Sequence, residues 1–140
     1  MTCRPRLLLA EDHLATAELV SALLESEFDV IAHVRDGRAL VNAADRLSPD
    51  VIVSDISMPG LDGITAASLI LQQHPEIPII FMTVHGDPHM VERGLATGAL
   101  GYVLKVVAGD DLMPAVRAAL RGERHVSPGL NYSDRNLRAS

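Results

Sequence analysis

The sequence predicts a doubly wound α/β domain, in which helices cover both faces of a parallel sheet. Two observations support this fold class. Five short apolar runs alternate with five longer segments of helical periodicity, and this alternation implies right-handed crossovers between parallel strands. A chain of 140 residues is also long enough for one such domain but too short for two of ordinary size. We therefore expect one domain with one functional site.

The first two units each pair an apolar run with an amphipathic segment. Residues 6–10 form the first predicted strand, and a helix is expected from about residue 13 to residue 27, where leucine and valine recur at four-residue spacing. Residues 30–34 form the second predicted strand. The apolar residues of segment 40–47 share one face of the following helix, which Pro49 ends.

The remaining three units follow the same pattern. Residues 51–54 are almost continuously apolar, which is typical of a central strand buried on both faces, and they precede Asp55. The other predicted strands are 77–82 and 101–104, and the other predicted helices cover about residues 64–73, 88–97 and 110–121. Pro75, Gly98 and Gly122 mark the ends of these helices. Residues 1–122 thus form the predicted domain, whereas residues 123–140 are polar and aperiodic and are interpreted as a tail or the start of a linker.

Composition and charge exclude several classes of function. A net charge of −6 argues against a protein that coats the phosphates of nucleic acid, because such proteins depend on clustered Lys and Arg. No apolar run approaches the roughly 20 residues needed to cross a membrane. The single cysteine, Cys3, cannot form an internal disulfide. We therefore expect a cytoplasmic protein without direct contact to nucleic acid or membrane.

Polar side chains that can carry chemistry follow four of the five predicted strands. They are Glu11 and Asp12 after the first strand, Asp55 after the third, Thr83 after the fourth and Lys105 after the fifth. Because ligands of open parallel sheets bind beyond the carboxyl ends of the strands, we expect these side chains to lie close together. Taken singly, each would be explained as a helix cap, an ordinary strand residue or a solvated charge. Their shared position favours a functional site.

The residue types at this site indicate phosphoryl chemistry with a metal ion. Three carboxylates close together repel one another, which raises their pKa values unless a cation neutralises them. An all-oxygen site with few protein ligands favours Mg²⁺, whereas Zn²⁺ prefers His or Cys. A phosphoryl group in transfer has three charged oxygens, which the metal, the Thr83 hydroxyl and the Lys105 ammonium would contact. Asp55 is then the in-line nucleophile that forms an acyl phosphate, beside Mg²⁺ held by Glu11 and Asp12.

At these positions the chain resembles the receiver domain of bacterial two-component response regulators, over residues 6–122. The resemblance rests on an ordered set of motifs. They are Leu8-Leu9-Ala10-Glu11-Asp12-His13, Val53-Ser54-Asp55-Ile56-Ser57-Met58-Pro59-Gly60-Leu61-Asp62-Gly63, Thr83, and Gly98-Ala99-Leu100-Gly101-Tyr102-Val103-Leu104-Lys105. The segment 101–105, with Asp110-Asp111-Leu112 and Val126-Ser127-Pro128, is similar to the subfamily usually joined to a LuxR-type helix-turn-helix domain.

The resemblance implies a flavodoxin-like (βα)5 fold with strand order 2-1-3-4-5. It also implies that a sensor histidine kinase passes a phosphoryl group from its phosphohistidine to Asp55, with the backbone carbonyl of Ser57 as a further metal ligand. Proteins of this family catalyse only their own phosphorylation and dephosphorylation. Thr83 and Tyr102 would form a coupled switch that alters the face made by the fourth helix, fifth strand and fifth helix. A homodimer could form through that face, and the output would be transcription or a partner protein.

Departures from the family pattern leave alternatives open. Val106 follows Lys105 where many receivers have a proline, and Val84, which would narrow access to Asp55, follows Thr83 where a smaller residue is common. One alternative is a degenerate receiver that binds partners without phosphorylation. An aspartyl-nucleophile phosphatase would have a second Asp two residues after the nucleophile, where this chain has Ser57. Tyr102 could also simply cover the sheet as a half-buried aromatic. Nucleotide binding is disfavoured because no glycine fingerprint follows the first strand.

Overall fold

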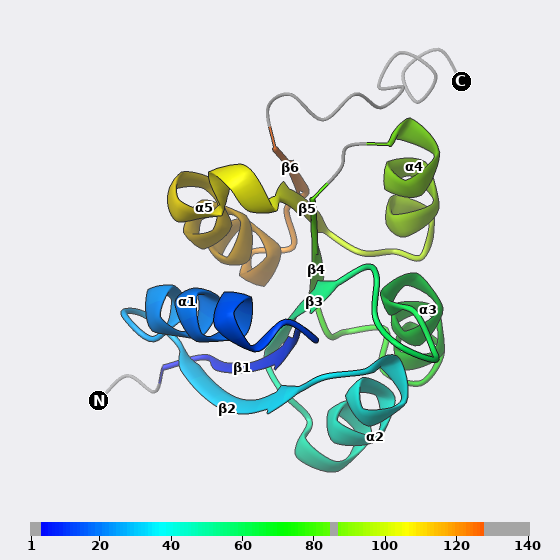
Figure 1. Ribbon diagram of the computed structural model, residues 1–140. Helices are drawn as coiled ribbons and strands as arrows, with labels where there is room; N and C mark the ends of the chain where they lie inside the picture. The colour runs from blue at the N-terminus through cyan, green and yellow to red at the C-terminus, as the bar shows by residue number, and fades with distance from the viewer. Residues whose placement is uncertain (1–3, 85–86, 128–140) are drawn as a thin grey trace.

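The described residues form one parallel sheet in the strand order β2-β1-β3-β4-β5-β6 (Figure 1). The strands are β1 (Arg6–Ala10), β2 (Asp29–Val34), β3 (Val51–Asp55), β4 (Ile79–Thr83), β5 (Gly101–Leu104) and β6 (His125–Val126). The structure is a computed structural model that describes residues 4–84 and 87–127, so Cys3 and most of the predicted tail lie outside the described residues. The predicted fold class and the order 2-1-3-4-5 are confirmed, and a sixth strand extends the sheet beyond β5.

Helices cover both faces of this sheet. They are α1 (Leu14–Leu24), α2 (Gly37–Leu47), α3 (Gly63–Gln73), α4 (Pro88–Ala96) and α5 (Ala108–Leu120), with a 3₁₀ turn, η1 (Lys105–Val107), before α5. Figure 1 shows α1 and α5 on one face and α2, α3 and α4 on the other. Among the described residues, no helix has the length and apolar character required to cross a bilayer.

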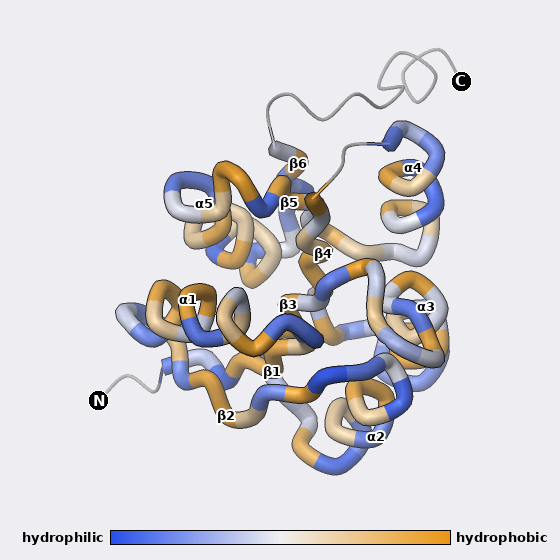
Figure 2. The backbone as a smooth tube through the Cα atoms, in the orientation of Figure 1, coloured by the Kyte–Doolittle hydropathy of each residue, from blue (hydrophilic) through white to orange (hydrophobic). Residues whose placement is uncertain are grey.

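Alternation along the strands explains why both faces are covered. In β1, Leu7 and Leu9 belong to the core beneath α1 and α5, whereas Leu8 and Ala10 belong to the core beneath α2, α3 and α4. All four side chains are fully buried, because successive residues of a strand point to opposite faces. Figure 2 shows the same result as hydrophobic colour along β1, β3 and β4. The continuous apolar runs in the sequence are therefore strands with two buried faces.

Aspartate side chains begin three of the helices. Asp36 and Asp62 each accept a hydrogen bond of 2.8 Å from the backbone N–H three residues later. Asp87 accepts one of 2.9 Å from the backbone N–H two residues later, beside Pro88 in the first turn of α4. Such caps satisfy backbone groups that a helix leaves without partners. They set where α2, α3 and α4 begin, and hence the loops at the carboxyl edge of the sheet.

Two helix boundaries differ from the sequence-based expectation. α1 ends at Leu24 rather than near residue 27, because the N–H groups of Glu27 and Phe28 both donate to the Leu24 carbonyl and turn the chain. This turn buries Phe28, which is 3% exposed. α5 begins at Ala108 rather than near residue 110, directly after the turn η1.

The start of the predicted tail belongs to the folded domain. β6 pairs with β5 through hydrogen bonds from His125 N to Leu100 O (2.8 Å) and from Ser127 N to Tyr102 O (2.9 Å). The Asp111 carboxylate accepts hydrogen bonds from the Ser127 hydroxyl and, at 2.8 Å, from His125 Nε2. A two-residue strand has no periodicity, so side-chain and backbone hydrogen bonds define this element and the sequence pattern could not show it.

We expect Ser127→Ala to lower the free energy of unfolding by about 1–3 kcal/mol, because it leaves buried polar groups without partners. Ser127 is 3% exposed, and its hydroxyl oxygen accepts a hydrogen bond of 3.1 Å from Leu104 N. Urea denaturation would measure the change. The control is Ser26→Ala, whose hydroxyl makes an exposed hydrogen bond to Leu23 O and should cost less than about 0.5 kcal/mol. Equal losses in both variants would contradict the role of Ser127.

Candidate functional site

The polar residues predicted at the strand ends meet at the carboxyl edge of the sheet. Glu11 follows β1, Asp55 is the last residue of β3 and Lys105 follows β5. Carboxylate oxygens of Glu11, Asp12 and Asp55 all lie within 4.8 Å of one another. The parallel register accounts for this convergence, because every strand ends at the same edge.

Burial makes the charges of this cluster interact strongly. Glu11 is fully buried and Asp55 is 6% exposed, whereas Asp12 is half-buried. Lys105 Nζ lies 2.7 Å from Glu11 Oε1 and 3.0 Å from Asp55 Oδ2. Glu11 Oε1 is fully buried, and the ammonium of Lys105 is its charged partner. One ammonium thus faces three carboxylates, which leaves an excess of negative charge in a site of low exposure.

The pKa values of Asp55 and Lys105 both respond to this environment. Burial raises the pKa of the Asp55 carboxyl, with a further contribution from the nearby charge of Glu11, and these effects outweigh the opposing influence of Lys105. Burial acts to lower the pKa of Lys105, but its contacts with Glu11 and Asp55 outweigh burial and the pKa is raised. Lys105 therefore stays charged, while a cation bound near Asp55 would favour its ionised form.

The backbone around Asp55 is held by close packing. A Cβ atom on Gly63 would lie 2.1 Å from the carbonyl oxygen of Asp55, so only glycine fits at the start of α3. The backbone N–H of Gly63 donates to Ile56 O at 2.8 Å. The backbone N–H of Ser57 donates to the Asp55 carboxylate, which places this loop residue directly beside the cluster. The segment from Asp55 to Gly63 is thus anchored at both ends.

Thr83 and the two valines that depart from the family pattern lie at or just after the ends of β4 and β5. Thr83 ends β4 and is in register with Leu104, so it lies one strand away from both Asp55 and Lys105. Val84 is 63% exposed and Val106 is 84% exposed. Both valines therefore present apolar surface to solvent at the edge where the carboxylates meet.

The metal site predicted from the sequence fits the residues that the structure brings together. The donors are oxygen atoms, which hard divalent cations prefer. Glu11 Oε1 is buried and shares the ammonium of Lys105 with Asp55, so the cluster keeps a net negative charge. Glu11, Asp12 and Asp55 would hold the ion, and excess negative charge would favour its binding. Zn²⁺ fits less well, because no His or Cys among the described residues belongs to this cluster.

Tyr102 turns its ring into the protein. The side chain is fully buried, with its ring centroid 5.9 Å from that of Phe81. A Cβ atom on Gly94 of α4 would lie 2.8 Å from Tyr102 Cε2, so the absence of a side chain at Gly94 makes room for the ring. The Tyr102 hydroxyl is buried and makes no hydrogen bond among the described residues. Burial, together with the charge of Asp87, raises the pKa of this phenol well above its usual range.

Two residues that no sequence motif marks, His33 and Gly94, contact Glu11 and Tyr102 respectively. His33 Nε2 lies 2.8 Å from the backbone carbonyl oxygen of Glu11. The sequence contains one signal for His33, a polar residue that interrupts an otherwise apolar strand. Gly94 gives no such signal, because a glycine within a helix indicates nothing about which ring packs against it.

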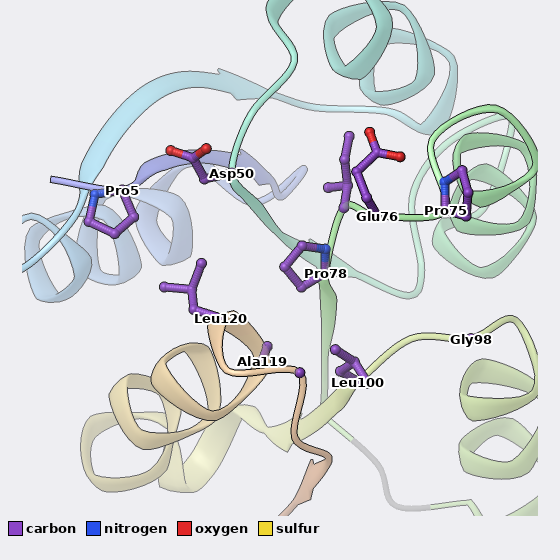
Figure 3. A pocket seen from close by; sticks show the side chains of 11 residues that line it. Pro5, Asp50, Pro75, Glu76, Pro78, Gly98, Leu100, Ala119 and Leu120 are labelled. Carbon is purple, nitrogen blue, oxygen red and sulfur yellow. The ribbon is translucent and has the colours of Figure 1, made fainter. Parts of the chain in front are cut away.

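A separate cavity of about 550 Å³ lies at the opposite, amino-terminal edge of the sheet (Figure 3). Its lining includes Pro5, Asp50, Pro78 and Leu120. The strand ends at this edge carry none of the clustered carboxylates or Lys105. The chemistry of the candidate site therefore lies in the polar cluster and not in this larger hollow.

We expect Asp55→Asn to raise the free energy of unfolding at neutral pH in the absence of divalent cations, because it removes a buried, crowded carboxylate charge. A raised pKa in the folded state means that wild-type stability falls as the pH rises from the ordinary carboxyl value of 3.8 through the folded pKa. The advantage of Asp55→Asn should therefore grow over that interval and then level off. Urea denaturation between acidic and neutral pH measures it. Exposed Asp29→Asn is the control, and the same pH dependence there would refute the assignment.

We expect Gly94→Ala to force the Tyr102 ring away from α4, with a loss of about 1–3 kcal/mol of stability from overpacking. The pKa of the phenol should fall toward its ordinary value of 10, because the ring becomes more exposed. Ultraviolet titration in a Tyr132→Phe background, which leaves one tyrosine, would measure it. Gly109→Ala is the control, since its Cβ would meet nothing within 4 Å. An unchanged pKa in Gly94→Ala would show that the helix moves instead.

Comparisons with known proteins identify the family. The response regulator receiver domain matches residues 7–117. The transcriptional regulatory protein DegU of Brevibacillus brevis is 32% identical over 130 residues, which cover 91% of this chain and 55% of that protein. A LuxR-family two-component response regulator from Aurantimonas superposes with a TM-score of 0.90 at 28% identity, over 99% of this chain and all of the other.

The receiver domain of RcsB from Salmonella enterica, solved in the presence of the phosphomimetic BeF₃⁻, has a TM-score of 0.84 at 28% identity, with 91% of this chain and 96% of that chain covered. The chain spans little more than half the length of the curated relatives it matches, so the likeness concerns their receiver portion. A family match over most of the chain and the shared fold lead to the same conclusion. The chain belongs to the response regulator receiver domain family, and it is similar to transcriptional regulatory proteins and to a LuxR-family response regulator of known structure.

Proposed function

We propose that the protein is a phosphorylation switch in which Asp55 accepts a phosphoryl group from the phosphohistidine of a sensor histidine kinase. The single observation that carries this proposal is the buried cluster of Glu11, Asp12 and Asp55 with Lys105 against it. A structural salt bridge would need one carboxylate for one ammonium, whereas the ammonium of Lys105 is shared by two carboxylates of a cluster of three. Such a surplus is suited to a site that binds a divalent cation and then a phosphoryl group.

Each residue has a defined role in the transfer. An Asp55 carboxylate oxygen attacks phosphorus in line, the phosphorus–nitrogen bond to the histidine breaks, and the bonding electrons leave with the imidazole. Lys105, already 3.0 Å from Asp55 Oδ2, and the Thr83 hydroxyl would each contact an oxygen of the phosphoryl group. Bound Mg²⁺ would neutralise charge on Asp55 and on the phosphoryl oxygens, held by Glu11, Asp12, Asp55 and the backbone carbonyl of Ser57. The protein turns over no other substrate and catalyses only its own phosphorylation and dephosphorylation.

The output would follow from the contacts that the new phosphoryl group makes. Movement of Thr83 toward it would favour the inward ring of Tyr102 and change the α4-β5-α5 face, as a shift between two existing packings. That face would form a homodimer or contact a partner protein in the cytoplasm. Because the relatives are transcriptional regulators roughly twice as long as the aligned segment, we propose transcription as the output, with nucleic acid bound outside this chain.

Acetyl phosphate with Mg²⁺ should add one phosphoryl group to the wild type, and intact-mass spectrometry would detect it. We expect no adduct without Mg²⁺, because the charge of the carboxylate cluster then repels the incoming phosphate. Asp55→Asn should give no adduct, whereas the exposed control Asp29→Asn should be modified like the wild type. A folded wild type that is never modified would refute the proposal and favour a degenerate receiver that binds partners without phosphorylation.

A further inference from the structure

His33 lies on β2 beneath α1, in register with Leu9 of β1. The side chain is half-buried and lines a shallow hollow with Leu14, Ala17 and Glu18. Its Nε2 atom is 2.8 Å from the backbone carbonyl oxygen of Glu11. Because a carbonyl oxygen only accepts hydrogen bonds, Nε2 must carry the proton and donate it. The contact therefore requires a proton on Nε2 of His33.

The end of β2 anchors the Glu11–Asp12 segment at three points. Besides the His33 contact, the backbone N–H of Glu11 donates to Val34 O at 3.0 Å. Arg35 Nη2 donates to the backbone carbonyl of Asp12 at 3.3 Å, from an exposed position. Both backbone groups of Glu11 are therefore held by β2. The orientation of the Glu11 peptide determines where its carboxylate lies, beside Lys105 and Asp55.

We propose that His33 is a positioning residue, which holds the Glu11 carbonyl so that the carboxylates of Glu11 and Asp12 keep the spacing that a hard divalent cation needs. The inference rests on the proposed function for the presence of the metal ion. Mg²⁺ tolerates little deviation from octahedral geometry, so its affinity is sensitive to small displacements of its ligands. Partners that orient metal ligands from outside the coordination shell typically contribute 10- to 100-fold in affinity.

Two substitutions of His33 separate positioning from packing. His33→Leu fills similar space but has no donor, and we expect Mg²⁺ to bind about tenfold more weakly. His33→Gln places an amide Nε2 at the same number of bonds from Cα, so it can donate to the Glu11 carbonyl and should stay within about twofold of the wild type. His74→Leu is the matched control, because His74 is a similarly exposed histidine that contacts Asp45 and Glu76 on the far side of the sheet.

Isothermal titration with Mg²⁺ would measure the affinities, with circular dichroism to confirm that each variant is folded. Weaker binding in His33→Leu with rescue by His33→Gln would support the proposal. Equal affinities in His33→Leu and the wild type would overturn it, as would equal losses in His33→Leu and His33→Gln. A loss of the same size in His74→Leu would also overturn it, because the effect would then not depend on the contact with Glu11.

Nitrogen-15 NMR without Mg²⁺ tests the contact independently of the metal. The proton should reside on Nε2 of His33, and the amide resonances of Glu11 and Asp12 should shift in His33→Leu but much less in His33→Gln. An Nε2 atom without a proton, or unchanged amide resonances in His33→Leu, would overturn the proposal. A wild type that shows these NMR features but binds no Mg²⁺ would instead refute the metal site of the proposed function, and with it the purpose assigned to His33. The two failures can thus be distinguished.

Discussion

The contact of Lys105 with two buried carboxylates is the interaction on which the carboxyl edge of this sheet depends. Parallel strands bring Glu11 and Asp55 to the same edge, where solvent cannot screen their repulsion. Lys105 compensates part of the charge at distances of 2.7 and 3.0 Å. The side chain reaches the cluster because β5 ends immediately before it and the turn η1 redirects the chain into α5. The positions of β5 and α5 therefore determine how far the charges of Glu11, after β1, and Asp55, at the end of β3, are compensated.

Surplus negative charge also suits this site to the proposed role of a switch better than to that of a structural centre. A buried cluster with matched charges would be stable in one state and would gain little from a ligand. Here the raised pKa of Asp55 shows that its ionised form is disfavoured by the protein alone. A group that neutralises or redistributes the charge changes the relative free energies of the local packings, and so it can shift their populations. The surplus of carboxylate charge that lowers the stability of the protein alone would thus also make the site respond to a group that neutralises this charge.

The inward position of the Tyr102 ring is favoured by some interactions and opposed by others. Burial of the ring against Phe81 favours the inward position, and Gly94 removes the steric obstacle to it. The buried hydroxyl without a hydrogen bond among the described residues opposes it, because loss of hydration is not repaid. The packing of the ring and the unpartnered hydroxyl contribute to the free energy with opposite signs. The inward position is therefore less stable than the buried area of the ring alone would indicate. The unpartnered hydroxyl thus offsets part of the stabilisation that packing against Phe81 provides.

The sequence predicted the fold class, five of the strands and the convergence of Glu11, Asp12, Asp55 and Lys105, because apolar runs and the residues that end them are local features. It could not predict contacts that depend on packing between elements. His33 touches Glu11 across neighbouring strands, Gly94 faces a ring from another element, and β6 is defined by its bonds to Asp111 and β5. Helix ends at Leu24 and Ala108 also depend on turns that hydrophobic periodicity does not encode.

The hydrogen bonds of Ser127 have a mechanical consequence. Its backbone and hydroxyl are bonded to Tyr102 O, Leu104 N and Asp111, so the last described residue is rigidly connected to the strand that precedes Lys105. These bonds fix the orientation of Ser127 relative to β5 as well as its distance from that strand. Rotation of β5 or of the first turn of α5 would therefore turn Ser127 with it. The carboxyl end of β5, where Lys105 meets the carboxylate cluster, is therefore coupled through hydrogen bonds to the last described strand, β6.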